Sequence, residues 1–336
     1  MKKVLLLGGT GAMGVYLIPE LLNKGYKVDV VSLDDVKSEN PNLSYLKMDC
    51  KDIGVQKKLL ENKYDAVVDF LIYNGDPNTE FKPRMEQFLA NTGHYVYFSS
   101  YRVYADEEHP IKETSPRLLD VSENADFLAV ANNEYSLYKA EGEELLKKSG
   151  KKNYTIVRPA ITFSKRRFQL TTLEADVLIA RMQDGRKVVL PEAAMDKQAT
   201  MSWAGDVAKM LCAIVLNEKA YGEAYTLATA EHQTWREITK IYAEIGGLKY
   251  ITVDTDTYLN IVNPGSPYAR YQLEYDRCFD RIVDNSKILE LAQIKQSELM
   301  PIKDALKMEF EALPKDVKWN HTDINDRMDA YLKSIE

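Results

Sequence analysis

The chain has 336 residues, 45% of them hydrophobic, which is enough for one large domain or two smaller ones around a sizeable core. Its formal net charge of −7, with acidic and basic residues interspersed, argues against a general nucleic-acid binder, because phosphate affinity needs concentrated Lys and Arg. The longest apolar runs are too short for a membrane span, and we expect neither a signal segment nor a membrane partner, hence a cytoplasmic location.

The cysteines and histidines indicate no metal centre. Cys50, Cys212 and Cys278 are too widely spaced for a disulfide framework or a metal knuckle, so we expect buried thiols. The four histidines do not fall at the spacing by which a helix presents two metal ligands.

Short apolar runs alternate with helical patterns through the first half of the chain. The runs are KVLLLGG, KVDVVSL, a shorter one before Asp49, DAVVDFLIY, HYVYFSS and NYTIVRP. The helical patterns lie near 13–24, 54–62, 81–91 and 133–148, and a long polar loop is expected from 105 to about 126. This alternation predicts an α/β fold of the Rossmann type, a doubly wound parallel sheet with six strands before residue 160.

The pattern loosens beyond residue 160 into shorter pieces, with helices expected near 173–183 and 205–216. Such a region usually covers one edge of the sheet and closes a cleft. We therefore expect three divisions: a Rossmann domain, to which later segments return, a smaller substrate-binding part, and a C-terminal helical tail. Their respective ranges are 1–163, 164–312 and 313–336.

A glycine loop opens the chain. Gly8, Gly11 and Gly14 are three residues apart, directly after a strand and at the start of a helix. A dinucleotide needs this arrangement, because the turn must be tight and the backbone must approach the pyrophosphate at a helix N-terminus. In this strand–turn–helix context the loop predicts dinucleotide binding.

The second strand bears on the choice of cofactor. Ser32 lies at its tip and Asp34 follows, with no arginine that would pair with the 2′-phosphate of NADP. This favours NAD, and NADP remains the alternative. Asp49 lies after the next strand and would meet the adenine edge or, in a second interpretation, cap the following helix.

A tyrosine and a lysine share one helix face in NNEYSLYKAEGEELLKK. Tyr135 and Lys139 are four residues apart, so their side chains are neighbours. A nearby ammonium group favours the phenolate, which would let Tyr135 exchange a proton with a substrate hydroxyl or carbonyl. Tyr138 is the weaker candidate, because Gly142 occupies the position four residues after it.

These motifs together resemble the extended (atypical) branch of the short-chain dehydrogenase/reductase superfamily, the NAD-dependent epimerase/dehydratase family. The resemblance extends to about residue 312. It is carried, in the family's order, by GGTGAMG, DAVVDFLIY, YFSSYRVYA, YSLYK, VRPAITF, WAGDVA and VDNSKILELA.

The resemblance implies an epimerase-like oxidoreductase for a sugar or nucleotide sugar, with hydride transfer to and from NAD. It implies that Ser100 orients the reacting oxygen, Tyr135 is the acid/base, and Lys139 holds the nicotinamide ribose. A homodimer is also typical of the family. The expected cofactor-binding residues are Gly8, Thr10, Gly11, Ala12, Met13, Gly14, Ser32, Asp34, Asp49, Cys50, Phe70, Leu71, Ile72, Ser99, Tyr135, Lys139, Pro159 and Ile161. The expected substrate-binding residues are Tyr73, Tyr101, Arg102, Arg166, Arg167 and Arg270.

The chain departs from the family's pattern next to Ser100. Tyr101 and Arg102 stand where dehydratases carry Asp and Glu, and a decarboxylase's glutamate before the valine is also missing. Without these carboxylates the resemblance favours an epimerase or a simple ketoreductase. Arg102 would suit an anionic substrate group, since a guanidinium pairs bidentately with carboxylate or phosphate, or it is a surface residue of the loop.

Two further departures from the family's pattern leave the identity of the substrate undecided. The segment 74–93 lacks the family's helix asparagine, and Ile161 replaces a second one, which argues against a standard UDP- or dTDP-sugar. The cationic run from Lys165 to Arg167 either holds a substrate diphosphate or is a solvated face. The SSYRVY-type loop also occurs in chloroplast stem-loop RNA-binding relatives, so a non-catalytic nucleotide- or RNA-binding protein is the alternative, although this chain keeps the Tyr–Lys pair that those relatives lack.

Overall fold

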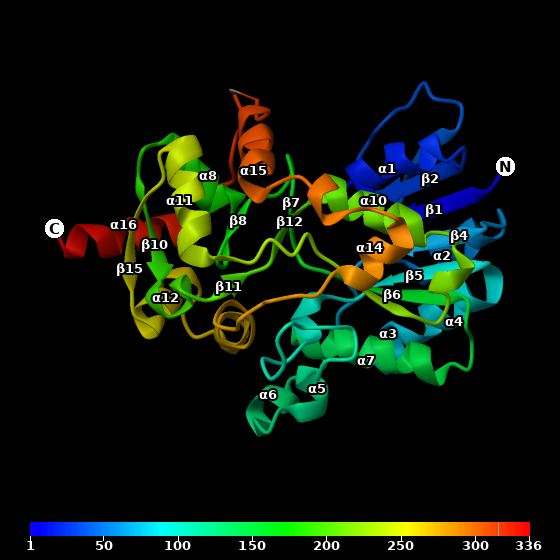
Figure 1. Cartoon of the computed structure of the whole chain (residues 1–336), viewed down its shortest axis with the longest axis horizontal. Coiled ribbons are helices and arrows are strands. Elements are labelled where there is room, and N and C mark those ends of the chain that lie inside the picture. Colours follow the sequence, from blue (N-terminus) through cyan, green and yellow to red (C-terminus); the bar gives the residue numbers. More distant parts are fainter. Residues whose placement is uncertain (315) are drawn as a thin grey trace.

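The computed structural model describes residues 1–314 and 316–336. One part is built on a large sheet and contains the N-terminus, while the other consists of small sheets and helices and contains the C-terminus (Figure 1). Among the described helices, none combines the length and the apolar character that crossing a membrane requires.

A seven-stranded parallel sheet forms the first part, in the order β13-β6-β5-β4-β1-β2-β3. Its strands are β1 Lys3–Leu7, β2 Lys27–Ser32, β3 Leu43–Lys47, β4 Ala66–Asp69, β5 His94–Phe98, β6 Tyr154–Pro159 and β13 Ala224–Leu227. The central strands are almost entirely buried, as expected when helices cover both faces. The predicted Rossmann-type fold is confirmed. The strand order reverses between β1 and β4, where open α/β sheets bind ligands.

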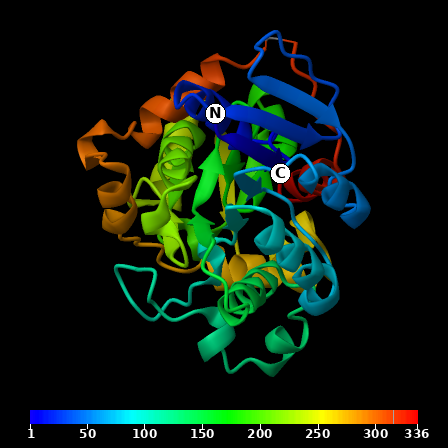
Figure 2. The same cartoon turned by 90° about the vertical axis from the view of Figure 1, so that its right-hand side faces the viewer.

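Helices cover both faces of this sheet (Figures 1 and 2). One layer contains α1 Gly14–Asn23, α10 Ala204–Ile214 and α14 Ser286–Ala292, and the other α2 Ile53–Leu60, α3 Pro77–Glu80, α4 Lys82–Asn91 and α7 Tyr135–Lys148. The early helices begin and end within two residues of the predicted bounds. The expected loop 105–126 differs, because it contains the short helix α5 Leu118–Val121 and the start of α6 Ala125–Ala129. The buried Phe127 anchors α6 against Tyr275, 4.4 Å between ring centroids.

The second part packs short strand pairs between helices. The pairs are β7 Ile161–Phe163 with β12 Met201–Trp203, β10 Lys187–Pro191 with β15 Lys249–Val253, β8 Gln169–Leu170 with β9 Leu173–Glu174, and β11 Gln198–Ala199 with β14 Gln233–Thr234. The helices are α8 Ala175–Gln183, α9 Glu192–Met195, α11 Trp235–Gly246, α12 Thr255–Val262, α13 Pro267–Gln272, α15 Ile302–Glu311 and α16 Asp323–Ser334. Its apolar core reaches Tyr101 and Val103 at the end of β5, so the second part packs against the ligand-binding edge of the sheet.

Candidate active site

A cavity of about 570 Å³ lies at the carboxyl ends of the central strands, within the size range of small-molecule sites. Residues from both parts of the chain line it. Among the residues expected from sequence, those in its lining are Gly8, Gly11, Ala12, Met13, Phe70, Ile72, Ser99, Ser100, Tyr101, Arg102, Tyr135, Lys139, Pro159, Ile161, Arg166 and Arg167.

The glycine loop forms one end of this cavity. Gly8 has a φ of 75°, in the left-handed region that favours glycine. A Cβ at Gly14 would lie 2.1 Å from the carbonyl oxygen of Gly9, so a larger residue would push α1 away from the loop. Gly11, Ala12 and Met13 then bring the start of α1 to the cavity, where its free N–H groups favour an anion. The loop therefore fits the pyrophosphate of a dinucleotide.

The residues expected around the adenosine, which follow β2 and β3 or end β2, are not part of the cavity lining. The buried Ser32 accepts a hydrogen bond from the backbone N–H of Asp34 at 3.2 Å, and the Asp34 side chain is exposed. Asp49 is also exposed and accepts from Lys51 N at 2.9 Å. The cap of α2 is Asp52, so the capping interpretation of Asp49 is wrong.

Four other expected cofactor or substrate residues support the cavity from outside its lining. The Leu71 side chain packs close to Gly8: a Cβ added there would lie 3.2 Å from Leu71 Cδ2. Thr10 is buried within the glycine loop. Cys50 is buried, and burial raises the pKa of its thiol to about 11. Tyr73 donates to the buried Asp69 at 3.1 Å, and its side chain lines a smaller adjoining pocket of about 350 Å³.

The adjacent serines at the end of β5 have different partners. Ser99 donates to Oε1 of the buried Glu143 at 2.6 Å, which ties the strand to α7. Ser100 is also buried, but its hydroxyl accepts from Arg102 N at 3.2 Å, and its interaction with Tyr135 opposes the rise of that tyrosine's pKa. Both serines line the cavity, as does the candidate acid/base Tyr135, and only the Ser99 hydroxyl is bonded to a carboxylate.

Tyr135 is the first residue of α7, because Glu134 caps the helix. The Glu134 carboxylate accepts from the backbone N–H groups of Ser136 and Leu137 at 2.6 and 3.0 Å. One turn later the buried Lys139 donates to the carbonyl oxygen of Phe98 at 2.7 Å. Its Nζ lies 5.8 Å from the centroid of the Tyr135 ring. The cap thus fixes where the predicted Tyr–Lys face meets the end of β5.

The charges around this pair shift its titration. Burial raises the pKa of Tyr135, while the charge of Arg102 and the nearby Ser100 hydroxyl oppose that rise. The Arg102 guanidinium lies 5.2 Å from the Tyr135 ring centroid. Burial also lowers the pKa of Lys139 to about 8. Two cationic side chains, Arg102 and Lys139, therefore lie beside the ring of the candidate acid/base.

Arg102 belongs to a cluster that sequence reasoning missed. It pairs with Glu134 at 3.1 Å and with Asp276 at 3.4 Å. Arg277 and Arg281 pair with the same Asp276 carboxylate. The side chains of Asp276, Arg277 and Arg281 are all buried. Within this group only Arg102 and Arg277 line the cavity.

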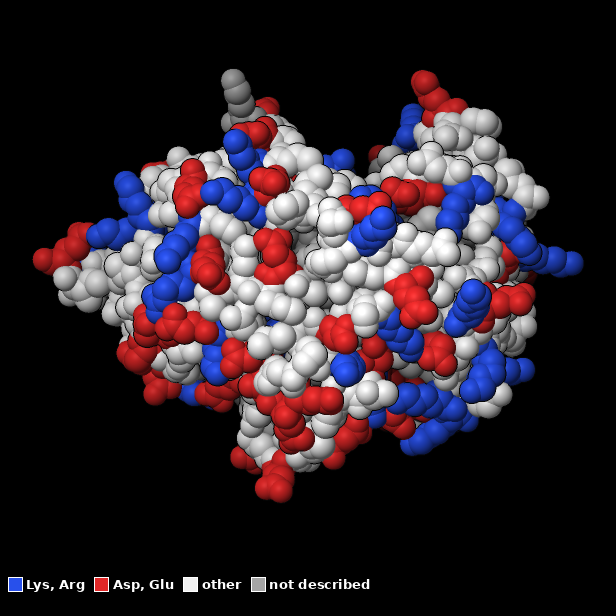
Figure 3. Space-filling view, viewed as in Figure 1, with Lys and Arg blue, Asp and Glu red and all other residues white. Residues whose placement is uncertain are grey.

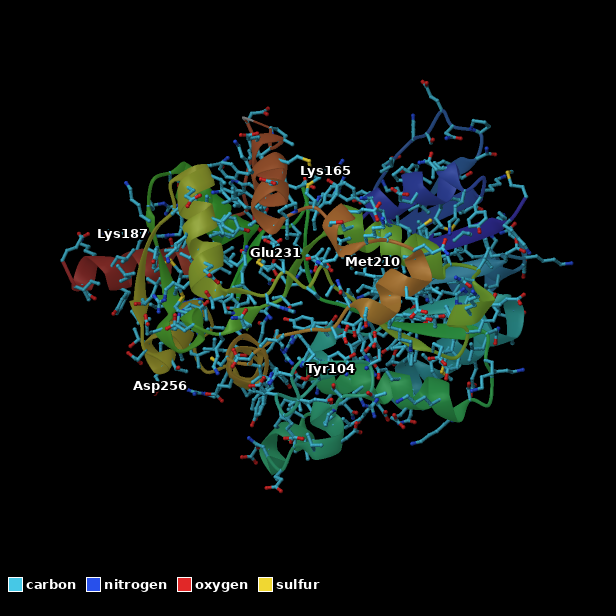
Figure 4. The ribbon with its side chains drawn as sticks, viewed as in Figure 1. Tyr104, Lys165, Lys187, Met210, Glu231 and Asp256 are labelled. Carbon is cyan, nitrogen blue, oxygen red and sulfur yellow. The ribbon has the colours of Figure 1, made fainter. Side chains whose placement is uncertain are left out.

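Arg277 is held rigidly at the cavity wall. It donates to the hydroxyl of Tyr101 at 3.1 Å and to the carbonyl oxygen of Thr171 at 2.7 Å. The expected Arg270 lies in the same segment but does not line the cavity. It pairs instead with Asp256 and Glu274 at 2.6 and 2.7 Å, and Asp256 lies at the periphery of the second part (Figure 4). Arg277, rather than the expected Arg270, therefore lines the cavity.

Comparison with known proteins finds one family model and several relatives that resemble this chain. Residues 4–228 match the model of the NAD dependent epimerase/dehydratase family. The chloroplast stem-loop binding protein of 41 kDa b from Arabidopsis thaliana is 24% identical over 261 residues, which are 73% of this chain. The chain spans 64% of the length of that curated relative.

Solved structures share the fold at low sequence identity. UDP-glucuronic acid 4-epimerase from Bacillus cereus, in complex with UDP-glucuronic acid and NAD, has a TM-score of 0.66 and 16% identity over 92% of this chain and 98% of that one. WbmH from Bordetella bronchiseptica, in complex with NAD⁺, has a TM-score of 0.64 and 18% identity over 93% and 99%. UDP-glucose 4-epimerase from Thermus thermophilus, in complex with NAD, has a TM-score of 0.66 and 16% identity over 94% and 100%.

Proposed function

The chain belongs to the NAD dependent epimerase/dehydratase family, and from this premise we propose that it is an NAD-dependent, epimerase-like enzyme acting on a sugar or nucleotide sugar. One observation carries the proposal. Ser100, Tyr135 and Lys139 meet at a cavity whose other end is the glycine loop. Residues from three separate segments supply the base, the group that orients its substrate and the cofactor cradle.

The loop from Gly8 to Gly14 would hold the pyrophosphate of NAD, and Lys139 the nicotinamide ribose. Bound NAD supplies a hydride acceptor that can return the hydride. Support for NAD over NADP comes from the tip of β2, where Ser32 and Asp34 stand and no arginine does. The solved relatives named above that carry NAD in their structures agree with this choice.

The protein residues handle the proton. Tyr135 takes the proton of the reacting hydroxyl as the carbon–hydrogen bond breaks, and returns it when the carbonyl is reduced. Ser100 orients the reacting oxygen toward the phenol. Arg102 and Lys139 favour the phenolate, because each brings a positive charge to within 6 Å of the ring centroid.

The cavity favours an anionic substrate that undergoes no elimination. Arg102 and Arg277 line it, whereas its glutamate, Glu174, is already engaged by Gln169 at 2.6 Å and Arg167 at 3.3 Å. No free carboxylate in the described lining is placed to remove a carbon-bound proton. Epimerisation through a keto sugar, or simple reduction of a carbonyl, remains as the chemistry of the site.

The first experiment measures NAD(H) binding and turnover of a panel of nucleotide sugars. We expect Tyr135→Phe to lower turnover by about 10²- to 10⁴-fold with cofactor affinity unchanged. Tyr138→Phe is the matched control, since its hydroxyl is three residues away on the same helix and has no hydrogen-bond partner among the described residues. Net oxidation of NADH would identify a ketoreductase, and interconversion without it an epimerase. Equal effects of the two variants would exclude the proposed role of Tyr135.

A second candidate, favoured by the stem-loop binding relative, is a nucleotide- or RNA-binding protein without chemistry. The face shown in Figure 3 intersperses basic and acidic side chains and offers no continuous basic surface there. Under this function the wild-type protein would retain a stem-loop RNA in a mobility-shift assay and convert no sugar. Tyr135→Phe would then change neither result.

A further inference from the structure

The cationic run after β7 forms a tight hairpin turn. Ser164 and Arg167 exchange two backbone hydrogen bonds of 2.8 and 2.9 Å, which leaves Lys165 and Arg166 at the tip. The hydroxyl of Ser164 accepts from Arg166 N at 3.2 Å and closes the turn. Neighbouring cations in the sequence therefore leave the hairpin in different directions.

The tip of the hairpin lies against the glycine-loop end of the cavity. Lys165 Nζ is 5.7 Å from the ring centroid of Tyr16, two residues after Gly14 on α1, and Figure 4 shows Lys165 between α15 and α1. Arg166 lines the cavity together with the glycine loop. Burial raises the pKa of Tyr45 on the edge strand β3, and the charge of Arg166 opposes that rise.

The base of the hairpin faces the end of the cavity that contains Tyr135. Arg167 pairs with Glu174 at 3.3 Å, and its charge acts on Tyr135 and Arg277. Neither Lys165 nor Arg166 is among the main charges that act on Tyr135. Arg166 and Arg167 therefore line the same cavity but lie toward different ends of it, Arg166 toward the glycine loop and Arg167 toward Tyr135.

We propose that Arg166, at the tip of this hairpin, binds a phosphate of the dinucleotide cofactor, so that a hairpin of the second part closes over the glycine loop. This assigns Arg166 to the cofactor, in place of the substrate role expected from sequence, and it rests on the proposed function. The loop's N–H groups would approach the phosphate from one side, and the Arg166 guanidinium would approach from the other as a charge-assisted donor. The phosphate is either the pyrophosphate, common to NAD and NADP, or the 2′-phosphate of NADP alone.

The test compares Arg166→Ala with Arg167→Ala. Both side chains are at least partly exposed, so thermal unfolding should be unchanged in each. Dissociation constants would be measured by calorimetry for NADH, NADPH, ADP-ribose and adenosine. We expect Arg166→Ala to lower the affinity for ADP-ribose by about 10- to 100-fold, as for the loss of a hydrogen bond to a charged group. The affinity for adenosine, which has no phosphate, should not change. For Arg167→Ala, the affinity for ADP-ribose should stay within about twofold of the wild-type value.

The arms of this experiment separate the two phosphates and the two proposals. An equal loss for NADH and NADPH identifies the pyrophosphate, whereas a loss confined to NADPH identifies the 2′-phosphate. Wild-type affinity of Arg166→Ala for all three phosphate-bearing ligands, or an equal loss in Arg167→Ala, would overturn the hairpin's role while leaving NAD-dependent chemistry standing. Failure of the wild-type protein to bind NADH, NADPH and ADP-ribose would overturn the proposed function and this inference with it.

Discussion

Two arginine clusters lie at the two ends of one face of α7, and they differ in how their charges are balanced. The face presents Tyr135, Lys139 and Glu143 at intervals of four residues. At the inner end, Glu143 accepts from Arg158 at 2.6 Å and from Arg117 at 3.0 Å. At the outer end, Tyr135 meets the cluster of Arg102, Arg277 and Arg281, which share the carboxylate of Asp276.

The inner cluster is a closed ion network. Arg117 also pairs with Asp120 and Glu144, each at 2.7 Å, so every guanidinium has a carboxylate. Burial alone would raise the pKa of Glu143, but Arg158, its hydrogen bonds and Arg117 hold it below its usual range. Such a network contributes to the scaffold and leaves no charge for a ligand.

The outer cluster carries excess positive charge. Three arginines share Asp276, and burial lowers the pKa of Arg281 to about 10. Arg102 and Arg277 turn this excess toward the cavity. The comparison teaches that buried arginines alone do not mark a site; what marks it is a charge left unbalanced beside a cavity, which an anionic ligand would compensate.

The largest effect should follow from breaking the closed network. Glu143→Gln leaves Arg158 and Arg117 buried with too little negative charge, and we expect the free energy of unfolding to fall by about 3–5 kcal/mol. Urea unfolding followed by circular dichroism measures it. Glu144→Gln, the next residue on α7 and partly exposed, should cost about 1 kcal/mol or less. Equal losses in the two variants would contradict the distinction between the clusters.

Lys139 lies between the clusters, and its pKa is lowered by burial from 10.5 to about 8. A lysine with a lower pKa in the folded state disfavours folding while it is charged. The penalty is complete below pH 8 and disappears as the pH rises toward 10.5, where the unfolded chain also loses its proton. Lys139→Met should therefore be more stable than the wild type at pH 7, by at most about 3 kcal/mol.

Urea unfolding at several pH values checks this. The advantage of Lys139→Met should shrink between pH 8 and 10.5, and Lys148→Met, on the exposed end of the same helix, should show no such trend. A difference that stays constant with pH would mean that Lys139 is not charged at a cost in the folded protein. It would also weaken the argument that this lysine supplies positive charge to Tyr135.

The fold and half of the site could be predicted because their signals are local. The glycine loop, the apolar strands and the Tyr–Lys spacing each occupy one short segment, and each lies where it was expected. Ser100 was also expected at the end of β5, and it lines the same cavity as Tyr135. Local patterns are therefore enough to locate the glycine loop and the Tyr135–Lys139 face, both of which line the cavity.

The arginine clusters could not be predicted, because their partners are far apart in the chain. Arg277 meets Tyr101 across 176 residues, and nothing in its own segment separates it from Arg270. Only burial distinguishes the two, since Arg277 is 3% exposed and the Arg270 side chain 43%. Ser99 was similarly assigned to the cofactor, although its hydroxyl is engaged by Glu143, 44 residues further on.

Removing one arginine of the outer cluster should affect binding more than folding. Arg277→Met leaves two arginines around Asp276, so we expect a smaller loss of stability than for Glu143→Gln. Affinity for UDP-glucuronic acid, used as an anionic probe, should fall by about 10- to 100-fold in calorimetry, as for a lost hydrogen bond to a charged group. Arg270→Met is the control and should bind as the wild type does. A loss of stability without any loss of affinity would make Arg277 part of the scaffold.

The smallest effect concerns the titration of Tyr135. Arg102 opposes the burial that raises the pKa of this tyrosine, so Arg102→Gln should raise that pKa further. Because the phenolate is the base, the rising limb of the pH–rate profile should move to higher pH, with part of the roughly 10²–10⁴-fold acid/base contribution lost at neutral pH. Arg102→Lys retains the positive charge, so the pKa of Tyr135 and the pH–rate profile should return most of the way to the wild-type position. If both variants lose activity equally at every pH, Arg102 contributes shape or substrate binding rather than charge, and the excess charge of the outer cluster acts on the ligand alone.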